Sequence, residues 1–365
     1  MSDLYIGLMS GTSLDGADGV LVDFSGAKLR VLASATESFS NEFRAELLAL
    51  NSPSPNELHR AAMAANQLAV VYANVVEALI LGSGVAAKDI KAIGAHGQTV
   101  RHQPALGYTT QLNNPALLAE RSGIDVVADF RSRDVAAGGQ GAPLVPAFHQ
   151  SVFGQPDQAT LVLNIGGISN LSVLPASGSV LGFDCGPGNA LMDAWVAQHT
   201  GQRFDDGGQW AASGQLIPEL LASLLDEPYF SMPPPKSTGR DLFSMAWLAT
   251  KLKPFAAQRP EDVQNTLTEF TASACTLGAS SYLKNSKELI VCGGGAFNQH
   301  LMQRLQVGLP ALKVVSSSTH GLPPLQVEAA AFAWLARQTV KRLPGNLPSV
   351  TGAAGLRILG AIYPA

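Results

Sequence analysis

The sequence predicts an α/β protein of two domains, each of which begins with a β-hairpin closed by a glycine-rich turn. The first hairpin spans residues 5–24, with short apolar strands on both sides of the turn at residues 11–18. The pattern recurs at residues 160–174, where Gly166 and Gly167 form the turn. A chain of 365 residues also has the usual length for two domains. Length and repetition together therefore indicate a duplicated α/β domain.

Composition excludes several classes of protein. Hydrophobic residues make up 46% and charged residues 14% of the chain, which is typical of a well-buried globular enzyme. The net charge of -4 and the lack of a basic cluster predict neither a nucleic-acid nor a membrane partner. We see no signal-peptide pattern and no uninterrupted apolar run near the ~18 residues of a membrane helix. Three cysteines without C-x-x-C spacing favour a reduced, cytoplasmic compartment.

The remaining elements follow from apolar periodicity and turn residues. In chain order we expect a helix pair within 41–82 broken at 52–55 and capped by Asn56, strands at 90–95 and 124–128, a helix starting at 190 and capped by Asn189, a helix at 264–283, a strand at 288–292 and a helix at 326–342. Polar residues follow the strands of the first half, where open α/β sheets place ligands. The small residues at 136–143 suggest a hinge. The expected domains are 1–138 with about 340–365, and 139–339.

The turn GTSLDGAD keeps the glycine spacing of a phosphate-binding P-loop but lacks its lysine. It also lies between two strands, whereas a P-loop or a Rossmann motif leads from a strand into a helix. Glycine-rich turns let backbone N–H groups approach phosphate oxygens, and three such turns follow strands here. They predict a nucleotide site made of Gly11, Thr12, Ser13, Leu14, Asp15, Gly16, Ala17, Asp18, Gly166, Gly167, Gly293, Gly294 and Gly295.

The acids of the first turn suggest a divalent metal. Mg²⁺ prefers oxygen ligands and keeps several waters, so Asp15 and Asp18 could hold it directly or through water. The alternative is that Asp15 and Gly16 are simply the turn dipeptide of a hairpin.

Asp184 is the leading candidate for a general base. It ends an apolar stretch just before the rigid turn Gly-Pro-Gly, where a carboxylate can accept a proton from a hydroxyl or a water. Its alternative role as a helix cap is weaker, because Asn189 is better placed for that. His96 and His102 are candidate substrate contacts or ordinary hydrogen-bonded loop residues.

Three further charged residues are weaker candidates. Arg131 and Arg133 could clamp a substrate carboxylate or form surface ion pairs. Glu328, near the start of an Ala-rich helix, could be a helix-dipole partner.

Several segments of the sequence resemble those of a known family. The paired hairpins and the terminal Gly-rich turn resemble the sugar kinase, heat-shock ATPase and actin superfamily. The segments GLMSGTSLDGAD, GAHGQTV, DFRSRDVAAGGQGAPLVP, LNIGGISNL, FDCGPGNALMDAW, PPPKSTGRDLF and VCGGGAFN are together similar to anhydro-N-acetylmuramic acid kinases. The resemblance covers nearly the whole chain. It implies two ribonuclease H-like domains of the actin-like ATPase superfamily, with a nucleotide cleft between them.

The resemblance also implies an activity. It implies that ATP, Mg²⁺ and water convert 1,6-anhydro-N-acetylmuramate, a small-molecule sugar, into N-acetylmuramate 6-phosphate and ADP during peptidoglycan recycling and amino-sugar catabolism. Asp184 and Glu328 become the catalytic residues, and Thr99, Arg131 and Arg133 the candidate sugar contacts. Cys185 departs from the Thr that is common at this position of the family. The oligomeric state stays open, with a homodimer as one outcome.

Two other functions remain open at this stage. One is a conventional sugar 6-kinase of the same superfamily, in which Asp184 deprotonates a free hydroxyl. The other is a non-catalytic, ATP-driven binding or regulatory module. The position of the oxygen label after a reaction in labelled water separates the two kinases.

Overall fold

The structure is a computed structural model that describes residues 2–11, 14–239, 241–284 and 286–365. It divides into two compact units, one comprising the chain up to Val152 together with Gln326–Ala365, and one comprising Phe153–Leu325. These boundaries differ from the expected 138/139 and 339/340. The segments 139–152 and 326–339 belong to the first unit because they pack within it: the rings of Phe148 and Trp334, for example, lie 6.2 Å apart.

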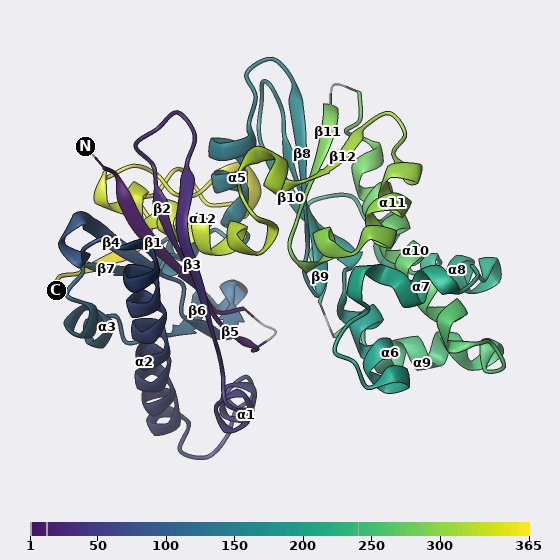
Figure 1. The fold of residues 1–365 in the computed structure, drawn as a ribbon, viewed down its shortest axis with the longest axis horizontal. Helices are drawn as coiled ribbons and strands as arrows, with labels where there is room; N and C mark the ends of the chain where they lie inside the picture. Colours follow the sequence, from purple (N-terminus) through teal and green to yellow (C-terminus); the bar gives the residue numbers. More distant parts are fainter. Residues whose placement is uncertain (1, 12–13, 240, 285) are drawn as a thin grey trace. The chain divides into compact units, whose positions relative to one another are not determined.

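The first unit is built on a mixed sheet with the strand order β13-β7-β4-β1-β2-β3 among the described residues (Figure 1). β1, β4 and β7 run parallel, while β2, β3 and β13 are antiparallel to their neighbours. A separate ladder joins β5 to β6. The elements of this unit are β1 (Leu4–Met9), β2 (Gly16–Asp23), β3 (Arg30–Ser38), α1 (Asn41–Ala49), α2 (Glu57–Ser83), β4 (Ile90–Ala95), β5 (Gln98–Gln103), β6 (Tyr108–Leu112), α3 (Pro115–Ser122), β7 (Val126–Ala128), α4 (Ser132–Ala136), α5 (Val145–Phe153, ending one residue past the unit boundary), α12 (Val327–Val340), α13 (Pro348–Thr351) and β13 (Ala361–Tyr363).

The second unit repeats the central topology of the first. Its sheet has the order β10-β9-β8-β11-β12 among the described residues, again with an antiparallel hairpin followed by parallel strands. The correspondence with β3-β2-β1-β4-β7 confirms the α/β class and the predicted internal repeat. The elements are β8 (Ala159–Ile165), β9 (Ile168–Leu174), β10 (Leu181–Pro187), α6 (Ala190–Thr200), α7 (Gln209–Ser213), α8 (Pro218–Leu225), α9 (Met245–Leu252), α10 (Pro260–Ser280), β11 (Ser286–Cys292), α11 (Gln299–Gly308) and β12 (Lys313–Ser316).

Two adjacent glycines bring α12 onto the sheet of the first unit. Gly7 of β1 pairs with Gly94 of β4. A Cβ on Gly7 would lie 1.8 Å from the carbonyl oxygen of Ala329, and one on Gly94 would lie 2.0 Å from that of Phe332. The helix backbone therefore touches the strands directly, which only glycine permits. This close approach holds α12, which carries Glu328 in its first turn, directly against β1 and β4.

Helix α2 is long and apolar enough to cross a membrane by length and composition alone. Its apolar face, however, packs against β2, β3 and α3, and Leu68, Tyr72 and Leu79 are fully buried in the core of the first unit. We therefore interpret α2 as a core helix. The expected cap at Asn56 is placed correctly but forms no side-chain cap bond, because this residue adopts a left-handed conformation with φ of 54°.

Candidate active site

The tip of the first hairpin lies between β1 and β2, with Met9 paired to Asp18. Leu14 adopts φ of 59°, and its N–H donates to the carbonyl of Gly11 at 3.2 Å, so the chain turns tightly here. A Cβ on Gly16 would lie 2.3 Å from the carbonyl oxygen of Glu37, so β3 requires glycine at this position. The expected strand, turn, strand arrangement is confirmed. Of the predicted nucleotide contacts, Thr12 and Ser13 lie outside the described residues.

The two acids of this hairpin offer carboxylate oxygens as possible ligands for a cation. Asp15 is exposed and lies 3.7 Å from the guanidinium of Arg44. Asp18 accepts a hydrogen bond of 2.7 Å from the Thr36 hydroxyl. Partial burial raises the pKa of Asp18, the Thr36 bond opposes this, and the charge of Asp15 raises it further. Two carboxylates that repel one another fit a hard cation, and Mg²⁺ commonly takes one or two carboxylates plus phosphate oxygens and waters.

The second hairpin and the third glycine-rich turn are packed together in the second unit. The carbonyls of Gly166 and Gly167 accept hydrogen bonds from Asn189 (2.7 Å) and Gly188 (2.9 Å), which joins the hairpin tip to the start of α6. Asn189 precedes α6 as expected, but its side chain donates to the Ile165 carbonyl rather than capping the helix.

Gly293 lies at the end of β11, beside the second hairpin. It has φ of 78°, and a Cβ there would lie 2.5 Å from the Asn164 side chain. A Cβ on Gly295 would lie 2.5 Å from the side chain of Ile165. Gly166, Gly167, Gly293 and Gly294 are thus at least partly exposed at this end of the second unit, whereas Gly295 is buried against Ile165.

Asp184 lies on β10, at the irregular pairing with β9 that precedes Gly186. Its Oδ2 accepts two hydrogen bonds, from the Ser237 hydroxyl at 2.9 Å and from the Thr238 N–H at 3.0 Å. Among the described residues, none donates to Oδ1. Burial raises the pKa of this carboxyl, and the bonds from Thr238 and Ser237 lower it. One oxygen is therefore held in place while the other can accept a proton, which suits a general base.

The loop that follows Tyr229 holds the backbone of Asp184 as well. The Tyr229 hydroxyl donates to the Asp184 carbonyl at 2.7 Å, and the Asp184 N–H donates to the Lys236 carbonyl at 3.0 Å. The Lys236 ammonium in turn lies 4.5 Å from the centre of the Tyr229 ring and donates to the Tyr229 carbonyl. Sequence reasoning identified residues 233–240 only as a polar loop and as part of the family pattern. It missed Ser237, Thr238 and Tyr229 because hydroxyl groups in a loop carry no distinctive spacing.

Ser237→Ala should move the acidic limb of the pH profile of activity to higher pH. The Ser237 bond favours the carboxylate form of Asp184, so its loss raises the pKa of Asp184 further, and a general base is active only above its pKa. The profile of kcat/KM against pH measures the effect. Ser244→Ala is a matched control, since Ser244 caps α9 through Trp247 in the same unit. An unchanged acidic limb in Ser237→Ala would contradict the assignment.

Arg131 is held by His96 in the first unit. The His96 Nδ1 lies 3.2 Å from the Ser10 carbonyl. The His96 Nε2 accepts hydrogen bonds from the Arg131 Nε at 3.2 Å and from the Arg131 Nη2 at 2.9 Å. Because an arginine can only donate, His96 is neutral with its proton on Nδ1. Burial, together with the charge of Arg131, lowers the pKa of His96 to about 3. Burial also lowers the pKa of Arg131 to about 10, and the nearby charge of Glu328 opposes this.

The structure thus brings Arg131 close to Glu328, and it links Arg131 through His96 and Ser10 to the start of β5. Ser10 donates to the side chain of Gln98, which directly precedes Thr99. The Thr99 hydroxyl accepts a hydrogen bond of 3.2 Å from Gln111 on β6. His96 and Ser10, which sequence reasoning gave little or no weight, therefore organise this group.

Arg133 points elsewhere. It is exposed and lines a cavity of about 680 Å³ together with Asp129, Arg342 and Arg357. None of the other predicted site residues lines this cavity. The two candidate arginines are therefore separated, and Arg131 alone of the two contacts His96.

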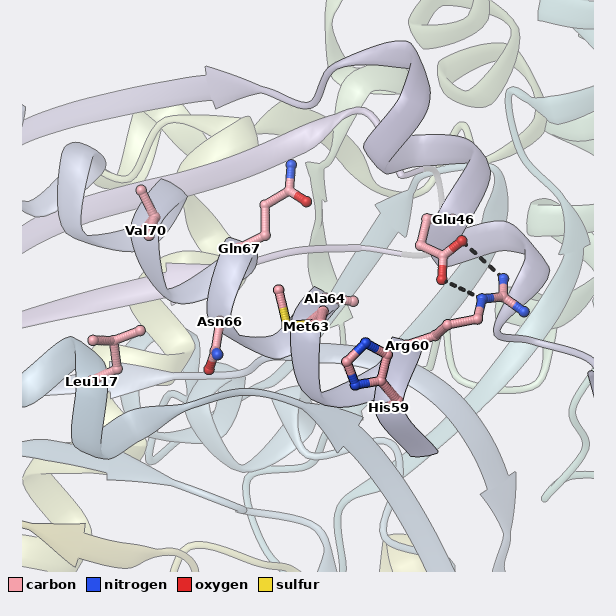
Figure 2. Close-up of a pocket in the computed structure, with 9 residues that line it drawn as sticks. All are labelled: Glu46, His59, Arg60, Met63, Ala64, Asn66, Gln67, Val70 and Leu117. Atoms are coloured by element: carbon pink, nitrogen blue, oxygen red, sulfur yellow. Dashed lines mark hydrogen bonds and ion pairs between the residues drawn. The ribbon is translucent and has the colours of Figure 1, made fainter. Parts of the chain in front are cut away.

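A further pocket of about 420 Å³ lies on α1, α2 and α3 (Figure 2). Its lining includes the apolar side chains of Met63, Val70 and Leu117 and the ion pair between Glu46 and Arg60. No predicted site residue lines this pocket.

Comparison with known proteins identifies the family. A family model described as anhydro-N-acetylmuramic acid kinase matches residues 3–365. Curated proteins named anhydro-N-acetylmuramic acid kinase from Albidiferax ferrireducens and Variovorax paradoxus are 64% and 63% identical, each over 100% of this chain and over 100% and 99% of their own length. A ROK family glucokinase from Streptomyces griseus, solved with glucose and AMPPNP, is 16% identical, with a TM-score of 0.43 over 92% of this chain and 99% of its own. On the family match and these identities, the chain belongs to the anhydro-N-acetylmuramic acid kinase family.

Proposed function

We propose that this protein is an ATP-dependent kinase that hydrolytically opens 1,6-anhydro-N-acetylmuramic acid and phosphorylates O6, which gives N-acetylmuramate 6-phosphate and ADP. Membership of the family supports the substrate and the reaction class, and peptidoglycan recycling is the role that goes with that name. The observation that carries the mechanism is Asp184, with one oxygen held by Ser237 and Thr238 and the other available to a proton.

The chemistry of the anhydro sugar explains why a base is needed. O6 is bonded to C1 in the bridge, so no free hydroxyl is present for an ordinary kinase reaction. In the proposed reaction, a water attacks C1 and gives one proton to Asp184. The C1–O6 bond breaks, O6 forms a bond to the γ-phosphorus of ATP, and ADP leaves. Atoms and charge balance without any further reactant.

Glu328 and Arg131 are proposed to act from the first unit. Glu328 assists at the anomeric carbon as the second carboxylate, in the way that glycoside hydrolases use a pair. Arg131 is the proposed partner of the lactyl carboxylate, because two of its donors remain after those used for His96 and Gly141. Thr99 is the proposed polar contact to the sugar.

The nucleotide is assigned to the glycine-rich turns. Gly11–Asp18 is proposed to take the phosphates together with Gly166 and Gly167, and Gly293, Gly294 and Gly295 the nucleoside. Asp15 and Asp18 are the residues that would hold Mg²⁺, directly or through water. When bound, the ion would neutralise charge on the transferring phosphoryl group.

Isotope labelling tests the reaction directly. With ATP and the 1,6-anhydro sugar in ¹⁸O-labelled water, the product should carry one label at C1 and none in the phosphate. The expected label follows from attack of water on C1 and of O6 on phosphorus. A product without label at C1, or faster phosphorylation of ordinary N-acetylmuramate, would overturn the hydrolytic mechanism and favour a conventional 6-kinase. ATP turnover that leaves no sugar phosphate would favour a non-catalytic module.

A further inference from the structure

Asp134 is a fully buried carboxylate three residues after Arg131, in α4. Its Oδ1 accepts hydrogen bonds from the Asn346 side chain at 2.7 Å and from the Thr351 hydroxyl at 2.8 Å. Its Oδ2 accepts the Gly141 N–H at 2.8 Å. All three donors are neutral, and no salt bridge of Asp134 occurs within the described part of the chain. Burying a carboxylate among neutral groups is costly unless its hydrogen bonds are complete, so each of these bonds counts.

Gly141 connects Asp134 to Arg131 through two hydrogen bonds. While its N–H donates to Asp134, its carbonyl accepts the Arg131 Nη1 at 2.8 Å. Gly141 has φ of 68°, and a Cβ there would lie 2.8 Å from the Val135 side chain. The same peptide segment therefore holds the guanidinium at one end and the buried carboxylate at the other, in a conformation that favours glycine.

The C-terminal segment closes the network from the other side. The Gln140 N–H donates to the Thr351 carbonyl at 2.7 Å, and the Ala354 N–H donates to the Ala137 carbonyl at 2.8 Å. A Cβ on Gly139 would lie 2.2 Å from the Asp134 Oδ2, so the loop wraps tightly around this carboxylate. The stretch 136–143, expected to be a hinge, is instead fastened within the first unit.

The guanidinium of Arg131 is thus fixed from two directions. Its Nε and Nη2 groups donate to His96, and its Nη1 group donates to the Gly141 carbonyl. These bonds use three of the five N–H groups of an arginine. A carboxylate ligand needs the remaining pair in a defined plane, because bidentate pairing depends on the angle of the fork. Any shift of Gly141 would rotate that plane.

We propose that Asp134 is a positioning residue for substrate specificity: through Gly141 it sets the plane of Arg131 and thereby the preference for sugars that carry a carboxylate. The inference rests on the proposed function, in which Arg131 receives the lactyl carboxylate. It extends that function by assigning a role to Asp134 and to its partners Asn346 and Thr351.

The test compares two sugars that differ in the carboxylate. Binding of 1,6-anhydro-N-acetylmuramate and of 1,6-anhydro-N-acetylglucosamine, which lacks the lactyl group, is measured by calorimetry on the full chain. In Asp134→Asn an amide group replaces one acceptor, so the bonds to Gly141 and Asn346 cannot both persist. We expect about tenfold weaker binding of the muramyl sugar, on the scale of supporting contacts around a ligand, with binding of the glucosamine sugar and of ATP unchanged.

A second pair of variants keeps the test valid if Asp134→Asn does not fold. Thr351→Val removes one donor to Asp134, and Thr339→Val is its matched control. Thr339 is also buried, and its hydroxyl donates to the carbonyls of Leu335 and Leu359 rather than to Asp134. Thr351→Val should lower the preference for the muramyl sugar, whereas Thr339→Val should not. Equal loss of affinity for both sugars, or no change in preference in either Asp134→Asn or Thr351→Val, would overturn the proposal.

The variant Arg131→Ala distinguishes a failure of this inference from a failure of the proposed function on which it rests. If Arg131→Ala leaves the preference between the two sugars unchanged, the proposed carboxylate contact itself is wrong. If Arg131→Ala removes the preference but the variants of Asp134 and Thr351 do not, only the positioning role fails. The double variant Arg131→Ala with Asp134→Asn should bind the muramyl sugar no more weakly than Arg131→Ala alone, because both changes act through one contact.

Discussion

Asp184→Asn is expected to lower the turnover number at least ~100-fold, the scale on which general-base catalysis contributes. Asparagine keeps the size of the side chain and can still accept the Thr238 N–H, so the loop around β10 should stay in place. What is lost is the oxygen that takes the proton of the attacking water. Steady-state kinetics with saturating ATP and sugar measure the effect.

Two control measurements show whether a loss of turnover in Asp184→Asn is specific to catalysis. Nucleotide binding should change little, because the glycine-rich turns do not include Asp184. Asp262→Asn is a matched control, since Asp262 is a buried carboxylate of the same unit that also accepts a backbone N–H, from Gln215 at 2.7 Å. Turnover in Asp184→Asn that stays near that of the unmodified protein would remove this residue from the role of base.

Arg131→Ala is expected to raise the KM for the anhydro sugar by about 100-fold, because two hydrogen bonds from a cation to a carboxylate are lost. Arg133→Ala supplies the comparison within the same segment of chain. Sequence reasoning could not decide between these two arginines. The structure places Arg131 against His96 and Gly141, and Arg133 in the cavity with Asp129 and Arg342.

The comparison of the KM for the sugar between Arg131→Ala and Arg133→Ala distinguishes the two candidate arginines. Arg133→Ala should leave KM within about twofold, as is usual for an exposed side chain outside the site. Steady-state kinetics at saturating ATP, with the sugar concentration varied, give both values. A larger rise of KM in Arg133→Ala than in Arg131→Ala would reverse the assignment of the substrate carboxylate.

Much of the fold could be predicted from local pattern. Alternating and continuous apolar runs located both hairpins and strand β11, and the long helical pattern located α12. The caps were less predictable. Asn56 and Asn189 precede their helices, yet neither side chain caps one, because a left-handed backbone at Asn56 and the nearby Ile165 carbonyl at Asn189 override the local preference.

The segment next to the expected domain boundary shows where local pattern ends. The stretch 136–143 is rich in glycine and alanine, which indicates flexibility when it is read alone. In the structure, the buried carboxylate of Asp134 and the C-terminal segment around Thr351 fasten it. Contacts between residues more than 200 positions apart leave no trace in the spacing of small residues.

The sequence by itself determined the α/β class, the repeated hairpins, the family, and Asp184 as the leading candidate base, because these depend on periodicity and on motifs contiguous in the chain. Only the tertiary structure decided how Arg131 differs from Arg133, that His96 is neutral and holds Arg131, and that Ser237 and Thr238 hold Asp184. The physical reason is that hydrogen bonds and burial act over a few ångströms in space. Residues far apart in the chain acquire a common role only when the fold brings them within that range.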